Sequence, residues 1–208
     1  RGYACTVDTV SGNVYVACKT SIGTNSLFAT SGCYQTTLAG NYDAFMVKFD
    51  PAGVRQWATF YGALYGENSA SCVTDVLGNV YMLGTTTSSI GIASSGAHQT
   101  VFGGNYDAFL VKFNSSGVRQ WCTYYGGNGT EWGNGCNVDA LGNVYVAGET
   151  TSSFNIATPG AHLTAGGGGN EGFLVKFNSN GVRQWGTYYG DNGTERGTSC
   201  ATDAAGNV

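Results

Sequence analysis

Charged residues are scarce in this sequence. They make up 11% of its 208 residues, and Pro, Met and His occur only twice each. A net charge of −4 with scattered Lys and Arg excludes the basic footprint of a nucleic-acid-binding protein. No run approaches the roughly 18 apolar residues that a membrane-spanning helix needs, so we expect no membrane insertion. The absence of any C-x-x-C pair leaves a zinc ribbon or a thioredoxin-type site without support.

Glycine, in contrast, is abundant. The chain has 34 Gly, which argues against a helical protein because each Gly inside a helix costs about 1 kcal/mol relative to Ala. Aromatic residues contribute 13% and apolar residues 42%, which argues against disorder. The composition therefore favours a packed chain that is rich in strands and turns.

A repeat of about 64 residues organises the sequence. The motif G-N-V begins at Gly12, Gly78, Gly142 and Gly206. The motif V-R-Q-W begins at Val54, Val118 and Val182, with spacings of 64 and 64. We expect three full repeats and the opening of a fourth, at about residues 3–66, 70–130, 134–194 and 197–208.

Each repeat is predicted to hold four strands. In the third repeat they are residues 135–139, 143–147, 172–177 and 182–189. An Asp or Asn opens the turn between the third and fourth strands, and a Gly closes it, as in hairpins. One such sheet cannot bury both faces alone, so tandem sheets predict propeller blades stacked around an axis. The expected fold is an all-β propeller segment of three four-stranded antiparallel blades plus the first strand of a fourth.

Several segments resemble a known repeat family. They are S-G-A-H-Q-T at 95–100, G-G-N-Y-D-A-F-L-V-K-F at 103–113, Y-Y-G-G at 124–127 and D-A-L-G-N-V-Y-V-A-G at 139–148. Together they resemble the SBBP β-propeller repeat, and the resemblance covers essentially the whole chain. It implies a propeller module of multidomain surface or secreted proteins, and it implies no reaction and no catalytic residues. A Cys in the first strand departs from the aliphatic residue that is usual there.

Three blades are too few to close a ring, since propellers typically need about four to eight. We therefore expect partners in the form of further blades of the same chain or other copies of it. Residues 197–208 are expected to pair with strands that the sequence does not contain, because a first strand alone leaves unpaired edge groups.

The acidic residues follow the repeat, which favours a structural role. An Asp that ends the first strand can accept backbone N–H bonds within a D-x-x-G-N turn. The predicted turn residues are Asp8, Asp75, Asp139, Asp203, Gly12, Gly78, Gly142 and Gly206. Equivalent acids in equivalent units lack the unlike environments of a catalytic pair.

Two further sets of acids follow the repeat, before the third strand and in the connection between blades: Asp43, Asp107 and Glu171, and Glu67, Glu131 and Glu195. A Ca²⁺ role for these two sets stays open, although the D-x-D-x-D-G spacing is absent. We predict no catalytic residue, no metal site and no cofactor.

The aromatic residues divide into repeated and unique positions. Trp57, Trp121 and Trp185 recur once per repeat and are expected to pack between blades, with sugar stacking as the weaker alternative. Trp132 has no counterpart and is a candidate ligand contact. His98 and His162 share one repeat position, where they are expected in loop packing or at the surface, with ligand contact as a further interpretation.

The cysteines suggest two different roles. Cys5, Cys72, Cys136 and Cys200 share a first-strand position. Packing near the axis is the favoured interpretation there, ahead of a ring of metal-binding thiols. Cys18 and Cys33 occur only in the first repeat and are predicted to form a loop-closing disulfide. Sequons at Asn114, Asn128 and Asn192 are compatible with glycosylation and favour an extracellular or cell-surface location.

Three functions remain open. The first is a non-enzymatic scaffold, interaction or adhesion module. The second is a carbohydrate-binding propeller with repeated sites on successive blades. The third, and weakest, is a fragment of a propeller enzyme whose unique residues lie on other blades.

Overall fold

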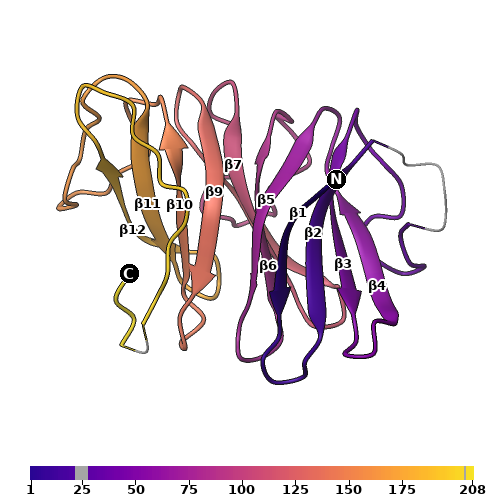
Figure 1. Ribbon diagram of the computed structural model, residues 1–208. Coiled ribbons are helices and arrows are strands. Elements are labelled where there is room, and N and C mark those ends of the chain that lie inside the picture. Colours follow the sequence, from indigo (N-terminus) through magenta and orange to yellow (C-terminus); the bar gives the residue numbers. More distant parts are fainter. Residues whose placement is uncertain (22–27, 204) are drawn as a thin grey trace.

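The computed structural model describes residues 1–21, 28–203 and 205–208. These residues form twelve strands and no helix, so they include no helix that could cross a membrane. The strands build three four-stranded sheets that lie side by side (Figure 1). The expected all-β class and the three antiparallel four-stranded sheets are therefore confirmed.

The sheets repeat one plan. The first contains β1 (Gly2–Val7), β2 (Val14–Thr20), β3 (Asp43–Phe49) and β4 (Arg55–Tyr61). The second contains β5 (Glu67–Thr74), β6 (Val80–Thr86), β7 (Asp107–Phe113) and β8 (Arg119–Tyr125). The third contains β9 (Glu131–Val138), β10 (Val144–Thr150), β11 (Glu171–Phe177) and β12 (Arg183–Tyr189).

Every strand pairs with its sequence neighbour, so each sheet is a simple antiparallel meander. The first strands β1, β5 and β9 lie next to one another toward the viewer in Figure 1, and β5 contacts both β1 and β9. Each sheet has two ends, which differ in the turns and connections that they carry. We call the end with the β1–β2, β5–β6 and β9–β10 turns the hairpin end, and the end where β4 leads to β5 and β8 to β9 the connection end.

Apolar side chains fill the space between neighbouring sheets. Met46 and Tyr61 of the first sheet pack with Met82, Phe109 and Phe113 of the second. A matching cluster joins the second sheet to the third; it includes Leu83, Leu110, Tyr125, Val146, Phe173 and Phe177. Because alternate residues of a strand point to opposite faces, each sheet offers one apolar face to each neighbour. The sheets thus bury faces that none of them could bury alone.

Residues 197–208 do not form the expected first strand of a fourth blade. Among the described residues of this segment no strand is present. Gly197 N–H donates to Gly148 O at 3.1 Å, and the segment still makes its turn, with Gly206 at φ 81°. A β-ladder needs an adjacent paired strand, and no described strand forms a ladder with this segment.

Candidate functional site

The hairpin end holds the predicted turn acids. Asp75 Oδ1 accepts the backbone N–H groups of Leu77 and Asn79 at 3.0 and 2.9 Å. Its Oδ2 accepts the side chains of Asn79 at 2.8 Å and Tyr81 at 3.1 Å. The glycine that closes this turn, Gly78, has φ 74°, a conformation that side chains other than Gly rarely adopt. Both carboxylate oxygens of Asp75 are therefore used in hydrogen bonds that stabilise the turn.

The same contacts recur at the other turns. Asp139 accepts Leu141 N–H and Asn143 N–H, both at 2.9 Å, and Asp203 accepts Ala205 and Asn207 in the same way. Asp8 accepts from Val10 and Ser11 in a turn that is one residue longer. The remaining turn glycines, Gly12, Gly142 and Gly206, have φ between 73° and 81°.

Lysines join the turn acids to the neighbouring sheet. Lys112 Nζ lies 3.7 Å from Asp75 Oδ2, donates to Ser179 O at 3.2 Å and sits over the Tyr81 ring. Lys176 lies 3.9 Å from Asp139 in the third sheet. Burial alone would raise the pKa of Asp139, but hydrogen bonds from Asn143 and Leu141 outweigh it and hold that pKa below its usual value.

Two of the three repeated tryptophans pack across a sheet boundary. Trp57 Nε1 donates to Ser115 O of the next sheet at 3.0 Å, and Trp121 Nε1 donates to Ser179 O at 3.1 Å. A Cβ on Gly117 would lie 2.8 Å from the Trp57 ring, so the indole rests directly on that turn. Trp185 contacts Tyr145 of its own sheet and is half-buried. Trp57 is buried, so its ring is not available for sugar stacking, whereas Trp121 is half-buried.

The connection end brings together acids that are 24 residues apart in the sequence. Asp107 and Glu131 are both fully buried and both face Gly126, because a Cβ on Gly126 would collide with each carboxylate. Asp43 and Glu67 have the same arrangement around Gly62. The signal that could have revealed the pairing is a constant spacing of 24 residues, which Glu171 and Glu195 share.

These pairs are satisfied by N–H and O–H donors. Asp107 accepts Gln99 Nε2 at 3.0 Å and Gly103 N–H at 2.9 Å. Glu131 accepts the hydroxyls of Thr150 and Ser152 at 2.6 and 2.5 Å. The ion pairs of the described residues involve other acids: Asp75, Asp139 and Glu149.

The electrostatics of the pairs follow from burial. Burial, together with the charge of Glu131, raises the pKa of Asp107 to about 6, although hydrogen bonds oppose the shift. Burial also raises the pKa values of Glu131, Asp43 and Glu67. Burial thus favours the protonated form of these four acids, whereas the donors around Asp107 and Glu131 favour the ionised form and occupy the oxygens that a cation would need.

The two histidines lie on loops beside a tyrosine of the fourth strand. His98 packs against Tyr125 and against Phe177 of the next sheet, with ring centroids 6.4 and 5.8 Å away. Burial of the ring and the nearby Arg183 lower the pKa of His98. His162 stacks on Tyr189 at 6.1 Å on the third sheet. The two rings stay on separate sheets and are not brought together.

The repeated arginines tie loops to strands. Arg183 Nη1 donates to Asn155 O at 3.0 Å, and Arg119 Nη1 donates to Ile92 O at 3.4 Å. In the first sheet Arg55 Nη1 donates to Phe28 O at 3.1 Å. Each bond links a fourth strand to the long loop of its own sheet, so these side chains hold the loops in place.

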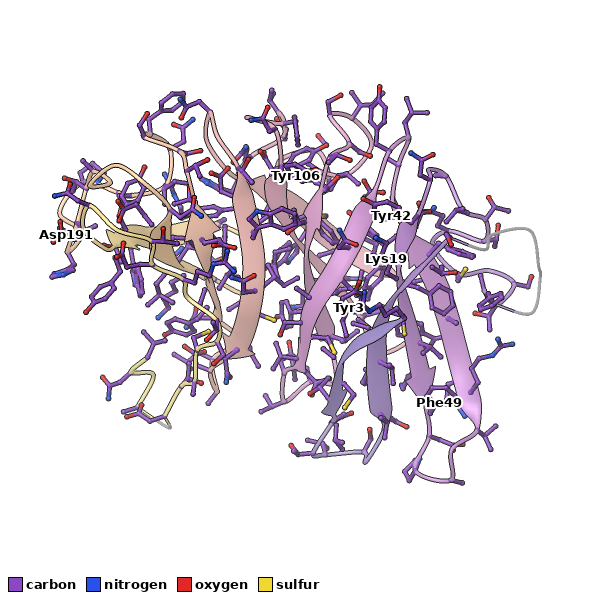
Figure 2. All side chains as sticks on the ribbon, turned by 45° about the horizontal axis from the view of Figure 1, so that its top comes forward. Tyr3, Lys19, Tyr42, Phe49, Tyr106 and Asp191 are labelled. Carbon is purple, nitrogen blue, oxygen red and sulfur yellow. The ribbon has the colours of Figure 1, made fainter. Side chains whose placement is uncertain are left out.

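Trp132 stacks on Tyr106 at the connection end, with centroids 4.9 Å apart and an interplanar angle of 27°. At the corresponding place in the first sheet, Lys19 Nζ lies 3.3 Å from the Tyr42 ring centroid. Figure 2 shows Tyr42 and Tyr106 at matching positions of their sheets. Tyr42 and Tyr106 thus occupy equivalent positions at the connection end, but the side chains that contact them differ.

The predicted disulfide between Cys18 and Cys33 is wrong. Both thiols are free, as are the other five cysteines. Cys18 lies on β2, whereas the loop around Cys33 bonds to β4, since Thr30 N–H donates to Ala58 O and Phe60 N–H to Gln35 O. Two strand spacings of about 4.8 Å separate β2 from β4, which exceeds the reach of a disulfide.

The first-strand cysteines and the sequons lie apart from any assembled site. Cys136 Sγ contacts Ser71 Oγ at 3.4 Å, and no group of three or more potential metal ligands occurs in the described part of the chain. Asn128 and Asn192 are exposed near the connection end. Asn114 is half-buried, and its Oδ1 accepts two backbone N–H groups of its turn.

Comparison with known proteins found a similarity to a family of repeats. No curated protein matches the chain. Residues 120–155, which run from β8 through β10, match the family model of the SBBP beta-propeller repeat. This part of the chain is therefore similar to the SBBP beta-propeller repeat, and the same order of strands recurs in the other sheets.

Proposed function

We propose that this chain is a non-enzymatic structural and interaction module of a β-propeller, and that its free sheet faces bind further sheets of the same repeat. Those sheets would come from the same chain or from another copy of it. The repeat family supports the coarse function. The finer proposal rests on one observation, which is the exposed part of the outer face of the third sheet, along β11 and β12.

That face carries the side chains that are buried elsewhere. Leu174 is half-buried, whereas Met46 and Leu110 at the same position are 0% and 1% exposed. Tyr189 is 67% exposed, whereas Tyr61 and Tyr125 are 1% and 2% exposed. A largely apolar groove of about 480 Å³ runs along this face, between β11, β12 and residues 195–201. Exposed apolar surface of this kind marks an interaction site.

Extending the chain tests the proposal. Val208 corresponds to Val144, so adding a copy of residues 145–194 after Val208 continues the repeat in register. We expect the extended protein to melt at a higher temperature, because the added sheet covers Leu174 and Tyr189. Leu174→Arg should lower that melting temperature far more in the extended protein than in the original chain. An unchanged melting temperature on extension would contradict the proposal.

An extracellular or cell-surface location is part of the proposal. The exposed sequons at Asn128 and Asn192 support it. Expression through a eukaryotic secretory pathway, followed by peptide mass analysis with Asn128→Gln as the control, tests whether the sites are accessible to glycosylation. An unmodified secreted chain would remove this support.

Carbohydrate binding is the second candidate. The stacked rings of Trp132 and Tyr106 favour it, because a flat aromatic surface at a rim is suited to a sugar ring. A glycan array with the natural chain and with Trp132→Ala decides between the two. Binding that the substitution abolishes would support the second candidate, and a blank array would leave the scaffold function.

A further inference from the structure

The connection that follows β12 differs in charge from the other two. It contains Asp191, where the first two connections have Ala63 and Gly127. Its first residue, Gly190, lies beside Glu171, and Glu171 replaces the Asp found at positions 43 and 107. Asp191 lies at the edge of the molecule in Figure 2. Acidic groups are therefore most concentrated at this third connection.

One carboxylate oxygen here has no partner. Glu171 is 2% exposed, and its Oε1 accepts Gly167 N–H at 2.7 Å and Gly168 N–H at 3.1 Å. Its buried Oε2 has no hydrogen-bond partner among the described residues. A Cβ on Gly190 would collide with both Glu171 Oε2 and Glu195 Oε2, so the two oxygens face the same small space.

The other two connections do not share this deficit. Asp107 uses both oxygens, since Oδ1 accepts Gly104 N–H at 3.3 Å and Oδ2 accepts two further donors. Glu131 receives two hydroxyls. Glu195 Oε2 instead accepts the Asp191 N–H at 3.2 Å. A buried carboxylate oxygen without a donor is costly, and a second carboxylate beside it increases the cost.

A hard cation with oxygen ligands relieves both problems at once. We propose that Glu171 Oε2 and Glu195 Oε2 bind Ca²⁺ at the third connection, with the exposed Asp191 carboxylate adding negative charge at the rim. Ca²⁺ fits better than Mg²⁺ because it accepts irregular sets of six to eight oxygens. No three acidic side chains converge within the described residues, so water completes the coordination. Such a site has a Kd of about 0.1–1 mM, the range of weak calcium sites.

Calorimetric titration of CaCl₂ into the chelator-treated full chain tests the site. We expect one saturable site per chain. Glu171→Asp restores the shorter side chain of the other connections and should weaken binding at least tenfold. Glu171→Gln should do the same without shortening the side chain. The matched control, Glu131→Gln at the second connection, should leave the affinity within twofold. Circular dichroism verifies that each variant is folded.

Three results would overturn the proposal. The first is the absence of a saturable signal with CaCl₂. The second is an equal response to CaCl₂ and to NaCl at matched ionic strength, which would indicate screening. The third is unchanged affinity in Glu171→Asp.

Discussion

The two ends of the same sheets hold their carboxylates in opposite ways. At the hairpin end, Asp75 and Asp139 each lie near a lysine and accept backbone N–H groups, and the pKa of Asp139 is lowered. At the connection end, Asp107 and Glu131 are buried together without an ion pair, and both pKa values are raised. A charged carboxylate is thus stabilised at one end and penalised at the other. Acids that look alike in a repeat can therefore make opposite contributions to stability.

The largest effect should come from the hairpin end. Asp75→Ala removes the acceptor of two backbone N–H groups and leaves Lys112, which is 9% exposed, without its acid. We expect a loss of about 3 kcal/mol in the free energy of unfolding, measured by urea denaturation. Asp50→Ala is the control, because Asp50 caps a turn without a lysine. Equal losses in the two variants would show that the lysine contributes nothing.

The connection end should be sensitive to shape. Gly126→Ala places a methyl group against Glu131 Oε2 and Asp107, and both carboxylates are held by hydrogen bonds. We expect a loss of about 2 kcal/mol, as for overpacking of a core. Ser116→Ala, at an exposed position of the β7–β8 turn, is the control for an unconstrained site. A melting temperature equal to that of the natural chain would mean that the paired acids can move apart.

The pH dependence of stability separates the two ends. Raised folded pKa values, such as about 6 for Asp107, mean that the folded chain binds more protons than the unfolded chain. Their stabilising effect is complete below the unfolded values and is lost as the pH rises through the folded values. We expect the free energy of unfolding to rise by about 1–2 kcal/mol between pH 8 and pH 5.

Below about pH 4 the sign reverses, because Asp8 and Asp139 have lowered pKa values and lose their stabilising effect when protonated. Urea denaturation at several pH values measures both limbs. A stability that falls steadily from pH 8 to pH 5 would contradict the raised pKa values.

The smallest effect should come from Glu131→Gln. The amide oxygen can keep the bond from Gly127 N–H, and the amide nitrogen can donate to the hydroxyls of Thr150 and Ser152. At pH 7 we expect a change within about 0.5 kcal/mol, in either direction, because one buried charge is removed. The rise in stability toward pH 5 should become shallower in this variant. A loss above 2 kcal/mol would show that the ionised pair is favourable.

The hairpin end could be predicted from sequence because its contacts are local. Asp75 accepts bonds from residues two to six positions away, and the D-x-x-G-N pattern contains all of these donors except Tyr81. The connection end could not be predicted in the same way. Asp107 and Glu131 belong to different sheets and meet only after the chain has crossed between them.

The same distinction explains the errors. Cys18 and Cys33 flank one loop, which suggested closure, but the residues around Cys33 bond to β4, whereas Cys18 lies on β2. The first strand expected within residues 197–208 has the right residues, yet a strand is a property of a pair and not of one segment.

The contact between Trp57 and Gly117 gives the array a direction. The indole of Trp57 rests on the turn of the sheet that follows it, and Trp121 repeats the contact on Gly181. The Trp and Gly residues of this contact are the same at both sheet boundaries, so the contact itself does not limit the number of sheets in the array. Gene duplication in units of one whole repeat would lengthen such a protein and preserve this contact at every boundary. An insertion of a few residues between the Trp and the Gly would instead disturb two neighbouring sheets at once.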